Sequence, residues 1–143
     1  MDFLVHILET KPFLLIGMLG LFFFFVLWML YISLYIYTNV YLKNICGLIY
    51  RDENRYKRLL ELFSFHYISM LPSAYWRETL NIKFNLSFKN LYQQKIYKRI
   101  DKNQLQEFLK QYPFFFISHY LIVLSGILGT LLLMLSYILS RFL

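Results

Sequence analysis

The sequence has few of the residues on which enzyme and metal chemistry depend. Its single cysteine, Cys46, excludes an internal disulfide and a cysteine-based metal cluster. The connecting part of the chain has no glycine-rich phosphate loop, no Cys/His metal spacing and no G-x-S-x-G motif. His66 falls in an apolar helical pattern without an obvious nucleophile partner. These absences predict a protein that is not an enzyme and that has no cofactor or metal.

Charge is missing from two long stretches of the sequence. Phe13–Tyr37 is a run of 25 uncharged residues, and Phe114–Ser140 is a run of 27. Roughly 20 apolar helical residues cross a hydrocarbon core about 30 Å thick, so both runs are predicted to be transmembrane helices. Neither run has the Asp, Glu, Lys or Arg of an ion pathway, and two helices cannot enclose a pore alone. A self-sufficient transporter is therefore not expected, although a pore built from several copies stays open.

A cleaved secretory signal is the main alternative for the first run. Such a signal has a basic start, a short apolar stretch and a cleavage site made of small residues. Here the start carries Asp2 and Glu9, the apolar run is too long, and no small-residue cleavage site follows it. We therefore expect the first run to be retained as a membrane anchor.

The charge that is present is concentrated between the two runs. Thirteen of the 15 Lys and Arg residues lie between Lys43 and Lys110, against six acidic residues, and the whole chain has a net charge of +7. Lys and Arg close to membrane spans stay on the cytoplasmic side. The connecting segment is therefore expected in the cytoplasm and both termini outside it. The same rule explains the basic charge, so a nucleic-acid partner is not expected.

These observations predict an all-α membrane protein, with two transmembrane helices joined by a helical, basic cytoplasmic segment. The expected parts are a short outer interfacial segment at 1–12, the first span at 13–38, the cytoplasmic segment at 39–112 and the second span at 113–141. The frequent Phe, Tyr, Ile, Lys and Asn residues hint at an AT-rich bacterial source. The predicted location is then the bacterial inner membrane, with both termini periplasmic.

The first helix is expected to continue to about Ile49, and three further helices are predicted in the connecting segment. One should run from Glu53 to about Met70, because apolar residues recur there at helical spacing. Ser73 is a candidate N-cap for the next. The third lies within Tyr97–Tyr112, where Asp101 and Gln104 have the spacing of a capping box.

Small residues in both spans predict where helices approach each other closely. Five of those in the second span recur at steps of seven or four, which makes a seam on one helical face: Ser118, Ser125, Gly129, Ser136 and Ser140. The first span, packed antiparallel, is one candidate for the helix that meets this seam, and a partner subunit is the other. The predicted helix-packing residues are Gly17, Gly20, Ser125, Gly126, Gly129 and Ser136.

A second group of residues is predicted to face the membrane surface or a partner protein. Basic residues beside a broad apolar helical face favour binding to an anionic cytoplasmic leaflet. Trp76 and Arg77 have the character of an interfacial pair. The predicted members of this face are Arg55, Lys57, Arg58, Phe63, Trp76 and Arg77.

Two single residues near the membrane boundary have competing interpretations. Cys46 is expected to be a buried or interfacial thiol, and S-acylation is the alternative. No charged neighbour in the sequence would obviously lower its pKa. His119 is expected to extend toward the interface, and a role as a proton relay or ligand is the alternative.

The segment Tyr97-Lys98-Arg99-Ile100-Asp101-Lys102, with a short amphipathic helix leading into Phe114-Phe115-Phe116-Ile117, resembles the universal stress protein B family. Those small bacterial inner-membrane proteins also have two spans, outward termini and a basic cytoplasmic stretch. The resemblance covers roughly 40 residues, and the connecting segment here is longer than in that family. It implies a stress-associated membrane protein without known catalysis.

The leading functional hypothesis is an accessory or assembly subunit of a membrane complex that acts through protein–protein contacts. Its expected partners are the lipid bilayer and either other membrane-protein subunits or further copies of itself. An oligomerising effector that permeabilises membranes, of the toxin or phage-defence type, is the main alternative. A lipid-surface sensor that uses Glu53–Met70 is the third.

Overall fold

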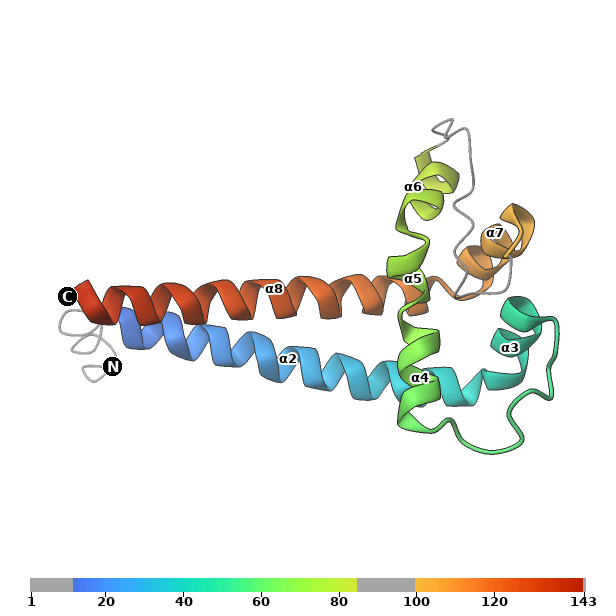
Figure 1. The fold of residues 1–143 in the computed structure, drawn as a ribbon, viewed down its shortest axis with the longest axis horizontal. Helices are drawn as coiled ribbons and strands as arrows, with labels where there is room; N and C mark the ends of the chain where they lie inside the picture. Colours follow the sequence, from blue (N-terminus) through green and yellow to red (C-terminus); the bar gives the residue numbers. More distant parts are fainter. Residues whose placement is uncertain (1–11, 85–99, 143) are drawn as a thin grey trace. The chain divides into compact units, whose positions relative to one another are not determined.

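A computed structural model of the chain describes residues 12–84 and 100–142. Every regular element in this described part is a helix, in keeping with the predicted all-α class (Figure 1). Predictions for 1–11 and 85–99, including the outer interfacial segment and most of the Tyr97–Arg99 motif, lie outside the described residues. The helices in chain order are α2 Pro12–Val40, α3 Leu42–Tyr50, α4 Leu62–Ser69, α5 Leu71–Ala74, α6 Trp76–Phe84, α7 Lys102–Gln111 and α8 Pro113–Phe142.

The two longest helices carry the apolar runs of the sequence. Phe13–Val40 has 28 residues and Pro113–Phe142 has 30, and each is long and apolar enough to cross a membrane. Only 6% and 11% of their most apolar windows are buried within the chain. The core helix of a water-soluble protein would be largely buried by its own chain, whereas these helices expose apolar side chains. The fold is therefore that of an all-α membrane protein with two spans.

The chain forms two compact units, which are described separately. The first, here called the span unit, comprises Met1–Tyr31 and Leu121–Leu143. The second, here called the connecting unit, comprises Ile32–Tyr120 and therefore includes one end of α2 and one end of α8. The predicted boundaries at 38 and 113 followed the uncharged apolar runs and Pro113, whereas these units follow how the residues pack.

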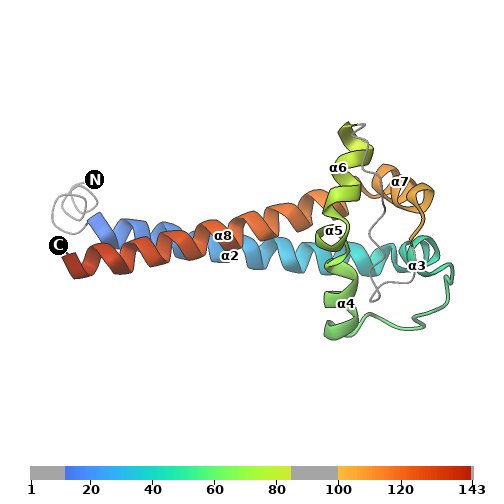
Figure 2. The same ribbon diagram turned by 45° about the horizontal axis from the view of Figure 1, so that its top comes forward.

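The connecting unit has an aromatic and aliphatic core of its own. Phe65, Phe108 and Phe115 are its largest fully buried side chains. The ring of Phe108 packs against Phe115 and Phe116, with centroids 5.2 and 5.1 Å away. Within this unit α4, α5 and α6 follow one another across the ends of α2 and α8, as both views show (Figure 2). Burial of these rings is the main driving force that holds the short helices together.

The helix predicted from Glu53 to Met70 is shorter than expected, and this prediction was wrong over its first half. The described chain is not helical from 51 to 61, and α4 begins only at Leu62. Asp52 accepts the backbone N–H of Asn54 at 3.1 Å, so its side chain closes a turn and does not cap a helix. Further along the loop, the backbone of Leu60 is bonded to side chains of α2.

Three other helix predictions can be compared with the structure. The first long helix does not run unbroken to Ile49, because it is interrupted at Tyr41 between α2 and α3. Ser73 is not an N-cap, because it lies inside α5 and α6 begins at Trp76. The capping box at the start of α7 is confirmed, since both halves of the Asp101–Gln104 exchange are present.

Candidate functional site of the connecting unit

The predicted small-residue seam is used inside the span unit. A Cβ atom added to Gly20 would lie 3.2 Å from the carbonyl oxygen of Gly129, and one added to Gly129 would lie 3.2 Å from that of Gly20. The two backbones therefore touch directly, which only glycine allows without displacement. Gly17 faces Ser136, whose hydroxyl donates a 2.7 Å hydrogen bond to the carbonyl of Phe13. Of the two predicted partners of the seam, the structure places α2 against it.

The remaining members of the predicted helix-packing group are less tightly placed. Ser125 is buried, at 7% exposure. A Cβ atom on Gly126 would meet only Cδ1 of Leu27, at 3.2 Å. A leucine side chain can move, whereas the carbonyl oxygen beside Gly129 cannot move without its backbone. Gly126 and Gly129, both predicted to be helix-packing residues, are therefore not equivalent.

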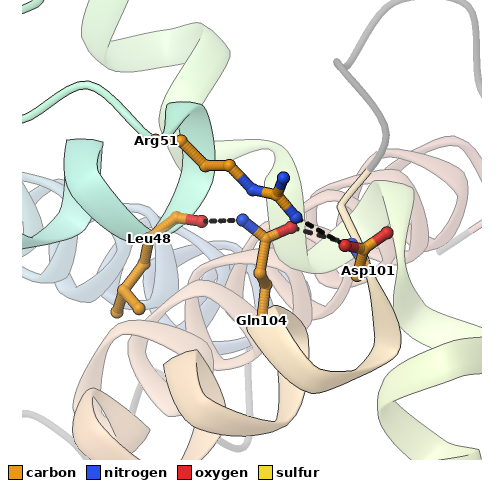
Figure 3. A network of polar contacts seen from close by, with 4 residues as sticks. All are labelled: Leu48, Arg51, Asp101 and Gln104. Atoms are coloured by element: carbon orange, nitrogen blue, oxygen red, sulfur yellow. Dashed lines mark hydrogen bonds and ion pairs between the residues drawn. The ribbon is translucent and has the colours of Figure 1, made fainter.

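A polar network joins the end of α3 to the start of α7 (Figure 3). Arg51 Nη2 contacts Asp101 Oδ2 at 2.6 Å, and the amide of Gln104 donates to the carbonyl of Leu48 at 3.1 Å. Gln104 also accepts the backbone N–H of Asp101 at 2.9 Å. The ion pair itself is well exposed, with 69% and 60% of the two side chains accessible, and such pairs contribute little stability. The network therefore joins α3 to α7 and sets their relative register.

A second set of hydrogen bonds fastens the irregular loop to the end of α2. The Tyr35 hydroxyl donates to the carbonyl of Leu60 at 3.0 Å, and the N–H of Leu60 donates to Asn39 Oδ1 at 2.8 Å. Asn39 in turn donates to the carbonyl of Tyr35 at 2.9 Å. Leu60 is 2% exposed, so both of its backbone groups are buried and satisfied by α2. These bonds fasten the loop to α2 at Leu60, two residues before α4 begins.

Sequence reasoning missed a contact between Ser73 and His119. The Ser73 hydroxyl lies 2.6 Å from Nε2 of His119, and the ring is also hydrogen-bonded to the backbone of Ser69. His119 is only 5% exposed, so the prediction that it extends toward the interface was wrong. The two residues are 46 positions apart, and no local sequence pattern pairs them. The histidine holds α4 and α5 against the start of α8.

Cys46 is fully buried, which agrees with the expectation of a buried or interfacial thiol. Burial raises the pKa of its thiol from 9.0 to about 11, although the positive charge of Arg55 acts in the opposite direction. Burial likewise raises the pKa of Tyr50 to about 12. The Arg55 guanidinium stacks 4.0 Å from the centroid of the Tyr50 ring. Cys46 is thus protonated at neutral pH and is not an activated nucleophile.

The predicted surface group is divided between two parts of the connecting unit. Phe63 is 87% exposed on α4, whereas Trp76 is 49% exposed on α6. Arg77 lies over the Trp76 ring at 5.4 Å, which supports the interpretation of these two residues as a pair. Lys57 and Arg58 are exposed on the loop before α4.

Lys57 and Arg58 line an open cleft within the connecting unit. It has a volume of about 420 Å³ and is formed by residues 39–44 on one side and 56–59 on the other. The first wall is the junction of α2 and α3, where the helix is interrupted at Tyr41. Lys43 adds a third cation to the lining. This cleft is the candidate binding site of the described part of the chain.

The residues described at 12–84 and 100–142 hold no cluster of three or more His, Cys, Asp or Glu that could bind a metal ion. In the same part of the chain, no buried side-chain nitrogen or oxygen lacks a hydrogen-bond partner. Comparison of the chain with protein-family models, with curated proteins and with solved structures found no match. The site must therefore be interpreted from its own geometry.

Proposed function

We propose that this chain is a non-catalytic integral membrane protein that acts through protein–protein contacts, as an accessory or assembly subunit of a bacterial inner-membrane complex. The proposal includes both termini in the periplasm and residues 39–112 in the cytoplasm. The placement of 13 of 15 basic residues between Lys43 and Lys110 supports this topology. Stress association is part of the proposal only through the resemblance of residues 97–117 to the universal stress protein B family.

The exposed side of α4 is the observation that carries the proposal. Phe65 and Ile68 of this helix are fully buried in the connecting unit. On the other side Leu62 is 72% exposed and Phe63 is 87% exposed, and Leu59 just before the helix is 73% exposed. A contiguous apolar patch at a protein surface marks a contact site. We name Leu62 and Phe63, the two exposed residues that lie on the helix itself, the α4 patch.

The small-residue seam of the span unit is the other surface predicted to make helix contacts. Gly20 and Gly129 already meet each other, so the tightest part of the small-residue seam is occupied within one chain. The polar side chains near the α4 patch also have structural partners, as the Tyr35–Leu60–Asn39 bonds show. The α4 patch therefore supplies apolar area for a partner protein beside a rigidly held loop.

Affinity purification of the full chain in native nanodiscs, followed by native mass spectrometry, tests this proposal. The wild-type chain is expected to carry a foreign membrane subunit in fixed stoichiometry. The variant Leu62→Ser/Phe63→Ser should lose that subunit because it removes the apolar anchors. Phe84→Ser is the matched control, because Phe84 is 61% exposed on α6 and lies outside the patch.

Two outcomes of this experiment would contradict the proposal. Equal loss of the subunit in the control would mean that the α4 patch is not the contact site. A pure homo-oligomer with membrane conductance would favour the alternative, an effector that permeabilises the bilayer. Depolarisation of cells on overexpression, measured with a potential-sensitive dye, identifies that alternative directly.

The non-catalytic part of the proposal has its own test. Ser73 and His119 form a serine–imidazole pair, which in hydrolases activates the nucleophile. A fluorophosphonate probe reacts with activated serine hydroxyls. We expect no more labelling of the wild-type chain than of Ser73→Ala. Labelling of Ser73 that disappears in His119→Ala would show that the pair is catalytic.

A further inference from the structure

The basic cleft between α2–α3 and the loop before α4 has the chemistry of an anion site. Lys43, Lys57 and Arg58 all line it, from two segments that are apart in the sequence. Within the described residues, none of the three forms an ion pair with a carboxylate, since Arg51 is the basic residue paired with Asp101. Three basic residues that line one cleft, with no carboxylate paired to them in the described part of the chain, attract an anion.

Two nearby arginines, Arg51 and Arg55, interact with other groups and do not line the cleft. Arg51 is held by Asp101 at 2.6 Å, and Arg55 is stacked on Tyr50 at 4.0 Å. Lys57 and Arg58 lie between this stacked residue and Leu60, whose backbone is bonded to Asn39 and Tyr35. The loop is therefore fixed at both ends, and its two free cations are kept at the cleft.

The apolar part of the lining indicates an amphiphilic ligand. Val40 and Leu59 belong to the same lining and are 68% and 73% exposed. Val40 is also the last residue of the candidate span Phe13–Val40. A cleft that begins where a span ends lies at the level of lipid headgroups when that span crosses the bilayer. A free inorganic anion has no apolar part and would leave the side chains of Val40 and Leu59 exposed to water.

We propose that this cleft binds the phosphate headgroup of an anionic phospholipid, with Lys43, Lys57 and Arg58 as the phosphate contacts. The guanidinium of Arg58 can donate two parallel hydrogen bonds to one phosphate, and the two ammonium groups add charge without fixed geometry. The exposed side chains of Val40 and Leu59 contact the glycerol and upper acyl region. This site requires that α2 crosses the bilayer, but it does not depend on a protein partner.

Native mass spectrometry of the purified chain, released from nanodiscs, measures the lipid that each molecule retains. Nanodiscs of phosphatidylcholine with a fraction of phosphatidylglycerol are compared at constant ionic strength. The wild-type chain should retain phosphatidylglycerol selectively. Lys43→Gln/Lys57→Gln/Arg58→Gln should lower this retention about tenfold or more, because it removes all three cationic contacts to the phosphate.

The matched control removes the same charge elsewhere in the connecting unit. Lys83→Gln/Lys102→Gln/Lys110→Gln changes three exposed lysines that do not line the cleft. This variant should retain phosphatidylglycerol within about twofold of wild type, because a bound lipid responds to nearby cations. Circular dichroism of both variants verifies that their helices are unchanged.

Three results would overturn the proposal. Equal loss of phosphatidylglycerol retention in the two triple variants would show only the general attraction of a basic protein to an anionic surface. Unchanged retention in the cleft variant would exclude the three residues as contacts. Retention of inorganic phosphate that added phosphatidylglycerol does not displace would show a site for free phosphate. Since the purified chain is used alone, failure here is distinguishable from failure of the subunit proposal.

Discussion

At the scale of single residues, polar side chains in this protein mainly hold helices in place. Asn39, Gln104 and His119 each bond to a partner from another element. A buried polar group is costly when it loses its partner, so such residues stabilise one arrangement of the chain over others. Lys43, Lys57 and Arg58 differ from these residues, because they line the cleft without forming an ion pair in the described part of the chain.

Substitution of His119 tests its role as a structural contact. His119→Ala removes the bonds to Ser73 and to the Ser69 backbone, and should lower the free energy of unfolding by about 1–3 kcal/mol. His66→Ala is the control, because His66 is exposed on α4 and should change stability by less than about 0.5 kcal/mol. Titration with a denaturing detergent, followed by tryptophan fluorescence, gives both values. Equal effects would contradict the assigned role.

Cys46 should be unreactive in the folded chain. A pKa of about 11 in place of 9.0 leaves about a hundredfold less thiolate at pH 8, and full burial blocks access as well. Alkylation by N-ethylmaleimide should therefore be at least about a hundredfold slower than in denatured protein. Gln106→Cys in a Cys46→Ala background is the exposed control. Rapid labelling of Cys46 in the native chain would contradict its burial.

The Cys46 thiol makes the free energy of unfolding depend on pH. Its pKa is raised in the folded state, so between pH 9 and about 11 the unfolded chain releases a proton that the folded chain retains. Stability contributed by the protonated thiol is complete below pH 9 and falls as the pH rises through this window. Cys46→Ala should remove this part of the alkaline loss, measured by the same detergent titration.

At the scale of elements, tight packing between α2 and α8 depends on particular positions of the seam. Gly129→Leu should destabilise the span unit by about 1–3 kcal/mol or more, because its side chain would meet the backbone of Gly20 and the Phe24 ring. Gly126→Leu adds the same side chain to the same helix but meets only the movable Leu27 side chain. Gly126→Leu should therefore lower the free energy of unfolding by less than half as much as Gly129→Leu. Equal costs would mean that the close backbone contact is absent.

The predicted start of α7 was confirmed, whereas the helix predicted from Glu53 was wrong over its first half, and the two outcomes have different physical causes. The start of α7 carries its own signal, because Asp101 and Gln104 satisfy each other's backbone groups within one turn. The stretch 53–61 has helical spacing of apolar residues, but within it the backbone of Leu60 is bonded to Asn39 and Tyr35 of α2. Local periodicity cannot reveal a distant partner that offers the backbone better hydrogen bonds.

At the scale of the whole molecule, the proposed topology predicts which residues an impermeant reagent reaches. In a Cys46→Ala background, Ser140→Cys should react with a membrane-impermeant maleimide at the periplasmic face of intact cells. Gln106→Cys should react only after the cells are lysed, because α7 belongs to the basic segment proposed to be cytoplasmic. Both side chains are exposed in the structure, so protein burial does not confound the comparison. The reverse pattern would overturn the proposed orientation.

The sequence by itself determined the helical class of the protein and its two long apolar helices. These properties follow from local causes, namely an uninterrupted apolar run and the absence of charge over the length of a span. The small residues that let helices approach closely could also be identified, because their spacing places them on one helical face. The capping box of α7 was predictable for the same reason.

Only the tertiary structure decided which residues meet across the chain. Ser73 reaches His119, Leu60 reaches Asn39, and Lys43 joins Lys57 at one cleft. Each of these contacts joins residues that are 14 to 46 positions apart. Their energies are realised only when other elements have already packed, so no local pattern records them. The candidate binding site consists of such contacts, and for this reason it could be recognised only in the folded chain.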